Sequence, residues 1–199
     1  MDRSTLAAYD ADPQAYVDRW LARPEASGLL ALMREHFKPG GLTADIGSGS
    51  GRQAAWLAAQ GFAVVGFDAS EGLLAQARAR HPQIEFRQAV LPDLRGVAPG
   101  SFDNVFCKGV LMHLPRAEIA PAVANIAWLL KAGGTLLLNW RITRPADERD
   151  EYGRLYSAFE SDLVRKALDG VTILYDAEDR RSEHVYHTIL ARAGGSARP

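Results

Sequence analysis

A glycine-rich turn is the part of this sequence best suited to chemistry. Gly47, Gly49 and Gly51 alternate with serines directly after the short apolar run Leu42–Ile46, and a helical pattern begins at about residue 51. Glycines let a backbone turn tightly and let a ligand approach the main chain closely. In open α/β sheets, ligands bind beside such turns at the carboxyl ends of strands. The spacing alone also fits a purely structural turn, so further residues must decide.

Two aspartates accompany this turn. Asp45 precedes the glycines at the end of the first apolar run, and Asp68 ends the next one, Phe62–Phe67. An acid at the end of the second strand is where a ribose diol can donate two hydrogen bonds. Asp68 could instead cap the helix that follows, although Ser70 can fill that role equally well. The turn and Asp68 together indicate a ligand that contains a ribose.

Strands and helices alternate around these residues, which sets the expected architecture. Apolar strands are predicted at 42–46, 62–67, 84–86, 102–107 and 135–140, with helices at about 51–60, 71–80 and 116–131 between them. A helical stretch over 12–38, interrupted at Pro24, precedes the first strand. Alternation of this kind implies parallel strands with helices on both faces.

The end of the chain follows a different pattern. Ser157 begins an apparent capping box for a helix that runs to about Leu168. Two strands follow, Val171–Tyr175 and Val185–Ala191, joined by the polar segment Asp176–His184. Strands joined without a helix between them pair antiparallel. The predicted fold class is therefore α/β, a seven-stranded, mostly parallel sheet with helices on both faces and the last strand antiparallel.

Length and composition predict one domain over residues 1–199. Within it we expect a helical cap at 1–40, a ligand-binding core at 41–142, a terminal helix and strand pair at 143–193, and a frayed tail at 194–199. The formal net charge of −1 gives no general attraction to nucleic acid. Cys107 is the one cysteine, which excludes an internal disulfide or a cysteine-based zinc cluster, and it lies in an apolar run. No metal site is predicted.

The beginning of the chain has no signal-peptide pattern, and no apolar run approaches the roughly 18 residues of a membrane-spanning helix. The expected location is the cytoplasm, without a membrane partner, as a monomer or homodimer.

Four segments in order resemble the class I S-adenosylmethionine (SAM)-dependent methyltransferases, which have a Rossmann-like sheet. They are Asp45–Gly51, Val65–Ser70, Ser101–Leu114 and Leu129–Leu136, and they cover about residues 40–140. The resemblance implies SAM as cofactor and transfer of its methyl group to an acceptor. It implies a cofactor-binding set of Asp45, Gly47, Ser48, Gly49, Gly51, Asp68, Ala69, Val90, Leu91 and Lys108. In this set Asp45 lies near the methionine amino group, Asp68 holds the ribose hydroxyls and Ala69 lies against the adenine.

The sequence departs from the family after the third strand. Many members carry an acid there that accepts from the adenine amino group, and the aligned position here is Val90. Adenine would then be held by apolar packing and backbone groups, or by Asp93 if the loop bends toward it.

A closer resemblance is to a bacterial small-molecule methyltransferase subgroup. Its features are Gly51-Arg52, Met112-His113-Leu114, Arg141 after the fifth strand, Glu160 opening the next helix, and Arg180 or Arg181 between the last strands. His113 is the candidate general base for an acceptor that arrives protonated, although a structural histidine explains it too. Tyr9, Tyr16 and Trp20 would cover the cofactor, with Tyr9 and Tyr16 also in contact with the substrate, or simply pack on the sheet edge. Arg141 and Arg144, with Arg180 or Arg181, could bind an anionic acceptor, or form a solvated or internally paired surface set.

Three other functions share features with this sequence. A nicotinamide-dependent oxidoreductase would carry GxGxxG, whereas the third glycine here comes one residue early. A protein that binds SAM without catalysis has the same motifs. A macromolecular methyltransferase is disfavoured because the charge is near neutral and because Cys107–Val110 lacks the Asn/Asp-Pro-Pro-aromatic pattern of amino-group methylation. The expected partner is a small-molecule acceptor, not nucleic acid.

Overall fold

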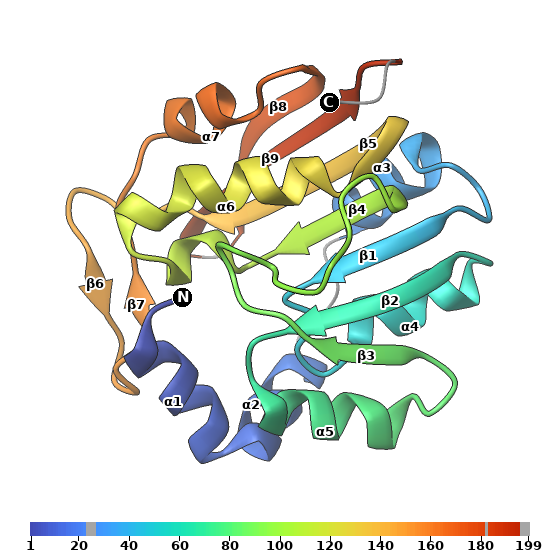
Figure 1. The fold of residues 1–199 in the computed structure, drawn as a ribbon. Coiled ribbons are helices and arrows are strands. Elements are labelled where there is room, and N and C mark those ends of the chain that lie inside the picture. Colours follow the sequence, from blue (N-terminus) through green and yellow to red (C-terminus); the bar gives the residue numbers. More distant parts are fainter. Residues whose placement is uncertain (23–26, 182, 196–199) are drawn as a thin grey trace.

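A computed structural model describes residues 1–22, 27–181 and 183–195 of the chain (Figure 1). The interruption predicted at Pro24 lies outside the described residues, as do residues 196–199 of the predicted frayed tail.

The main sheet has seven strands in the order β3-β2-β1-β4-β5-β9-β8. Their bounds are β1 Leu42–Ile46, β2 Ala63–Asp68, β3 Glu85–Gln88, β4 Phe102–Lys108, β5 Leu130–Arg141, β8 Val171–Arg181 and β9 His184–Ala193. The first five strands pair parallel, whereas β9 is antiparallel to both β5 and β8. The fold class predicted from the sequence is confirmed, including the antiparallel last strand.

Helices cover both faces of this sheet (Figure 1). They are α3 Ser27–His36, α4 Arg52–Ala59, α5 Glu71–Arg80, α6 Arg116–Trp128 and α7 Ser161–Ala167. Ile119, Val123 and Ile126 of α6 pack with Val164 of α7 in the largest apolar cluster, on one face. The helices α3 and α4 pack in a second cluster around Phe106, on the other face. Successive side chains along each strand point to opposite faces of the sheet, which fixes the helical layer that each side chain contacts.

A second group of elements lies beyond the carboxyl ends of the parallel strands (Figure 1). It comprises the helices α1 Arg3–Ala11 and α2 Pro13–Leu21, the 3-10 turn η1 Leu111–His113, and the short strands β6 Glu148–Arg149 and β7 Leu155–Tyr156. The helix α1 lies within the helical cap expected at 1–40 but before the helical stretch predicted over 12–38. It is short and buries only Thr5 and Tyr9. It is stabilised at its start by Asp2, whose carboxylate accepts from the Thr5 backbone N–H.

The capping box predicted at Ser157 is wrong. The Ser157 backbone N–H and hydroxyl donate instead to the carbonyls of Met112 and Leu114, at 2.8 and 2.5 Å. These bonds join the chain before α7 to the 3-10 turn η1, and the helix begins four residues later at Ser161. A serine near a helix start can satisfy a distant carbonyl as readily as a local N–H.

Two element boundaries also differ from the prediction. The polar segment Asp176–His184, expected as a connection, largely continues β8 as far as Arg181 and begins β9 at His184. Because β8 is an edge strand, its charged side chains can reach solvent or side chains outside the sheet, as Asp176 does with Arg165. The helix expected to reach residue 131 ends at Trp128, and β5 begins at Leu130.

None of the helices in the described part of the chain is both long enough and apolar enough to cross a membrane.

Candidate active site

The glycine turn is fastened to the neighbouring strand by its own backbone. The N–H groups of Gly47 and Ser48 both donate to the Phe67 carbonyl of β2, at 2.7 and 2.9 Å. Gly51 comes within contact of the Phe86 ring, since an added Cβ there would lie 2.6 Å from it. Main-chain bonds therefore fix the turn, and neighbouring side chains approach its glycines so closely that a side chain there would clash.

Gly47→Ala is expected to destabilise the chain more than Gly61→Ala does. Both glycines have positive φ, +73° and +87°, so both variants carry the left-handed strain of roughly 1–2 kcal/mol. A Cβ at Gly47 would also lie 2.1 Å from Val110 Cγ2, whereas nothing lies within 4 Å of one at Gly61. Urea unfolding of both variants measures the difference. Equal losses would show that Val110 yields and that the turn tolerates a side chain.

Asp68 lies at the end of β2 and faces the turn. Its carboxylate accepts from the Gly49 N–H at 2.8 Å and from the Ser70 N–H at 2.9 Å. The helix cap considered for Asp68 is supplied by Ser70, whose hydroxyl accepts from the Leu73 N–H. Burial raises the pKa of Asp68 above its ordinary value, and the backbone N–H donors oppose that rise. A carboxylate placed this way retains lone pairs for ligand hydroxyls.

One cavity of about 890 Å³ runs across the carboxyl ends of the strands, from Asp68 on β2 to Tyr186 on β9. This volume falls within the usual range of small-molecule sites. Most of the site residues predicted from the sequence line this cavity. They are Gly47, Ser48, Gly49, Asp68, Ala69, Leu91, Lys108 and His113, with Tyr9, Tyr16, Trp20 and Arg141.

Three predicted cofactor residues do not line the cavity: Asp45, Gly51 and Val90. Asp45 is buried at the end of β1, and Gly51 serves the turn itself. The Val90 side chain is 41% exposed, and its neighbours Ala89 and Leu91 face the cavity instead. Asp93, the alternative adenine partner, lies outside the cavity beside Arg95.

His113 is buried and hydrogen-bonded through both ring nitrogens. Its Nδ1 lies 2.6 Å from the Leu155 carbonyl, which can only accept, so Nδ1 carries the hydrogen. Its Nε2 then accepts from the Tyr9 hydroxyl at 3.0 Å. Burial lowers the pKa of His113 to about 4. The imidazole is thus neutral at physiological pH, and both of its nitrogens are occupied by protein groups.

Arg154 is a cavity residue that the sequence did not indicate. Its guanidinium lies 5.0–5.9 Å from the ring centroids of Tyr9, Tyr16, Tyr152 and Tyr156. It also pairs with Asp150 and donates to the Tyr9 hydroxyl oxygen at 3.2 Å. The tyrosines of the N-terminal helices and of the segment around β7 are therefore held together by one cation.

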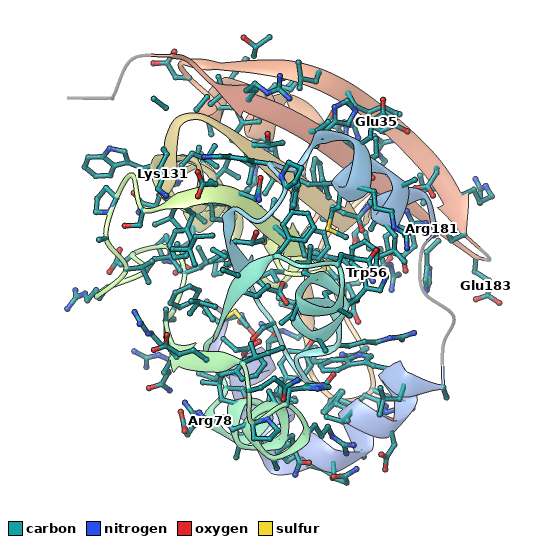
Figure 2. All side chains as sticks on the ribbon, turned by 90° about the vertical axis from the view of Figure 1, so that its right-hand side faces the viewer. Glu35, Trp56, Arg78, Lys131, Arg181 and Glu183 are labelled. Atoms are coloured by element: carbon teal, nitrogen blue, oxygen red, sulfur yellow. The ribbon has the colours of Figure 1, made fainter. Side chains whose placement is uncertain are left out.

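The arginines predicted near the acceptor divide into two groups. Arg141 and Arg181 line the cavity, and Arg181 lies with Glu183 at the tip of the β8–β9 hairpin (Figure 2). Arg144 is 52% exposed and pairs with Glu160 outside the cavity, and Arg180 does not line it either. Asn139 and Tyr156 also line the cavity and were not predicted. A polar residue that ends the apolar run of β5 is the signal that could have indicated Asn139.

Comparison with known proteins decides the family. A model described as "Methyltransferase domain" matches residues 44–138. The chain belongs to the SAM-dependent methyltransferases with a Rossmann-like sheet. A Geobacillus sp. (strain WCH70) protein named as a methyltransferase is 35% identical over 153 residues, which is 70% of this chain and 62% of that protein. The match to this methyltransferase family falls on the strands and turns that surround the cavity.

A second relative of this chain is the ubiquinone biosynthesis O-methyltransferase of Xanthomonas campestris pv. campestris (strain B100). It is 34% identical over 112 residues, covering 54% of this chain and 46% of the relative. The chain thus spans about half to three fifths of the length of these relatives. Among solved structures, the Burkholderia thailandensis 1,6-didemethyltoxoflavin-N1-methyltransferase with bound S-adenosylhomocysteine superimposes with a TM-score of 0.78. Its sequence is 19% identical, and the superposition covers 96% of this chain and 88% of the Burkholderia chain.

The residues at the β1–β2 end of the cavity fit SAM, the cofactor of this family. The buried Ser48 hydroxyl lines the cavity and has no hydrogen-bond partner among the residues that the structure describes. When SAM is bound, Asp68 would supply acceptors for the ribose, while Ala69, Ala89 and Leu91 would supply an apolar wall for the adenine. A side chain at Gly47 or Gly49 would come within 3 Å of its neighbours, which keeps the backbone bare there.

Proposed function

We propose that this chain transfers the methyl group of SAM to a small-molecule acceptor by direct in-line displacement. The observation that carries the proposal is that one cavity of about 890 Å³ joins the cofactor end at Asp68 to a second, polar end at Arg141 and Tyr186. The second end gives room for a ligand beside the cofactor. Its concave, tyrosine-lined walls suit a small molecule more than a duplex or a folded protein.

The main contribution of the chain is positioning. When bound, SAM supplies a methyl group on a positively charged sulfur, already activated for transfer. Asp68 and the glycine turn hold the cofactor at one end, and the walls of the other end orient the acceptor. Orientation of two reactants can lower a barrier by roughly 7–11 kcal/mol, which exceeds what one general base supplies.

His113 contributes less than its position suggests. Its pKa of about 4 makes it a weak base at neutral pH. The one lone pair of its ring, on Nε2, already accepts from the Tyr9 hydroxyl, while Nδ1 donates to the Leu155 carbonyl. His113 therefore positions Tyr9 in the cavity wall and does not take the acceptor's proton.

One binding measurement and one transfer assay test the proposal. Isothermal titration of the purified chain is expected to show binding of SAM and S-adenosylhomocysteine and none of NAD. Incubation with labelled SAM and a panel of metabolites is then expected to release labelled product from at least one small acceptor. Binding of NAD in place of SAM would contradict the proposal. SAM binding without transfer to any acceptor would favour the second candidate, a protein that holds SAM without catalysis.

The oxidoreductase alternative is disfavoured by the sheet itself. The nucleotide-binding order 3-2-1-4-5-6 has parallel strands throughout. Here the antiparallel strand β9 lies between β5 and the edge strand β8.

A further inference from the structure

Unused hydrogen-bonding atoms lie at the polar end of the cavity. Asn139 and Arg141 stand two residues apart on β5, so their side chains share one face of the sheet. Asn139 Oδ1 and Arg141 Nε are both buried, and neither has a partner in the described part of the chain. Both residues line the cavity. Buried polar atoms that remain unsatisfied at a cavity wall point to a ligand that satisfies them.

Asn139 presents an acceptor. Its side chain is fixed because Nδ2 donates to the His187 carbonyl at 3.2 Å and to the Thr188 hydroxyl at 2.9 Å. The residue is 1% exposed, so solvent cannot satisfy the remaining oxygen freely. A carbonyl oxygen cannot donate, and therefore the ligand must bring an O–H or N–H group to this point.

Arg141 presents a charged donor at the same wall. Its guanidinium carbon lies 4.6 Å from the centroid of the Tyr156 ring, which orients the planar group. Its Nη2 contacts the exposed Glu148 at 3.3 Å, and Nε has no such contact. A guanidinium edge held in this way matches the geometry of a carboxylate.

The surrounding walls favour a flat anion over a cation. The four tyrosine rings around Arg154 form a tyrosine cage that would suit an ammonium ion. This cage is already filled by the Arg154 guanidinium, which also pairs with Asp150. The cross-strand partner of Arg141 is Tyr186, and Arg181 lies 5.0 Å from the Tyr186 ring centroid. Tyrosine rings and guanidinium groups thus alternate around the polar end.

We propose that the acceptor is an aromatic acid that carries a hydroxyl or amino group at the end opposite its carboxylate. This inference rests on the proposed function. Arg141 binds the carboxylate, and Asn139 Oδ1 accepts from the hydroxyl or amino group. The Cα positions of residues two apart on a strand are about 7 Å apart, which is comparable to the length of a benzene ring with opposite substituents. Asn139 pairs in register with Lys108 at the end of β4, so the hydroxyl or amino end lies nearer to the glycine turn and is the end that is methylated.

Three probe molecules test this assignment on the full chain saturated with S-adenosylhomocysteine. They are 4-hydroxybenzoate, phenol, which lacks the carboxylate, and benzoate, which lacks the hydroxyl. Isothermal titration or ligand-observed NMR is expected to show 4-hydroxybenzoate binding at least about tenfold more tightly than either, since each loss leaves a buried group unpaired. Equal affinities, or no binding of 4-hydroxybenzoate, would overturn the assignment.

Arg141→Met then tests the carboxylate partner, with Arg144→Met as the matched control outside the cavity. Arg141→Met is expected to abolish the preference for 4-hydroxybenzoate over phenol and to leave the affinity for S-adenosylhomocysteine unchanged. Arg144→Met is expected to change neither. A preference that survives Arg141→Met rejects the role of Arg141. If S-adenosylhomocysteine fails to bind the unaltered chain, the proposed function itself fails; if it binds and the probes do not discriminate, only the acceptor class fails.

Discussion

Asp68→Ala is expected to weaken the binding of S-adenosylhomocysteine by at least about tenfold while the chain stays folded. A hydrogen bond to a charged group contributes about 1.5–3 kcal/mol, and 1.4 kcal/mol corresponds to a factor of ten. The carboxylate offers about four lone-pair sites, of which the Gly49 and Ser70 N–H groups use two. The remaining sites suffice for two ribose hydroxyls, and alanine removes them all.

A second variant separates ribose binding from support of the turn. Asp68→Asn keeps the size of the side chain and one oxygen for a backbone N–H, but it lacks the charge and half of the acceptor sites. We expect its affinity to fall between those of the native chain and of Asp68→Ala. Asp162→Ala removes a carboxylate that is 70% exposed on α7 and serves as the control. Isothermal titration measures all three variants, and circular dichroism checks their folding. Native affinity in both Asp68 variants would remove the ribose assignment.

The residues that the sequence located best are those at strand ends. Asp68 and the glycine turn were visible because an acid and a bare backbone follow apolar runs that must be strands. The same reasoning applies to Asn139 and Arg141, which end the longer run of β5. Arg141 was identified, but Asn139 was not, because it is followed by the buried Trp140 and looks like part of the core pattern.

Val90, expected near the adenine, is exposed and does not line the cavity. The expectation came from an aligned position and not from the direction of the side chain. Directly after β3 the chain alternates, with Ala89 and Leu91 buried and Val90 exposed. Residues one position apart in an extended segment point to opposite sides. The alternating direction of side chains after β3 favours Ala89 and Leu91 over Val90 as cavity residues.

The tyrosine cage around Arg154 could not be predicted from local patterns. Tyr9 and Tyr16 come from the beginning of the chain, whereas Arg154 and Tyr156 come from an irregular segment near β7. Their contacts join residues about 140 positions apart in the sequence. Periodicity reports which face of an element is buried and carries no information on which distant segment covers it.

The stability of the chain is expected to fall as the pH drops from about 6.5 to about 4, because His113 must remain neutral in the folded state. The folded pKa of His113, about 4, lies below the ordinary value of 6.5. Between these values the unfolded chain binds a proton that the folded chain does not, so stability rises with pH across this window and is lost as the pH falls. A shift of this size corresponds to about 3 kcal/mol.

Other groups titrate in different windows or with the opposite sign. The Lys38 ammonium, hydrogen-bonded to Asp103, lowers the pKa of that carboxyl to about 2, so its contribution is lost only below about pH 4. The raised pKa of Asp68 acts against the effect of His113, because the folded chain then binds a proton more readily than the unfolded chain. A variant comparison is therefore needed to isolate the histidine.

His113→Gln provides that comparison. Glutamine keeps a polar side chain but does not titrate, so the slope of the free energy of unfolding against pH between 6.5 and 4 is expected to be shallower than in the native chain by about 3 kcal/mol in total. The pKa of His81 is also lowered, by a burial that is only partial, and His81→Gln is expected to change the slope less. Urea unfolding at several pH values measures the three slopes. An unchanged slope in His113→Gln would mean that this histidine is protonated in the folded chain, and the bond from the Tyr9 hydroxyl to its Nε2 could not then exist, because a protonated nitrogen has no lone pair to accept it.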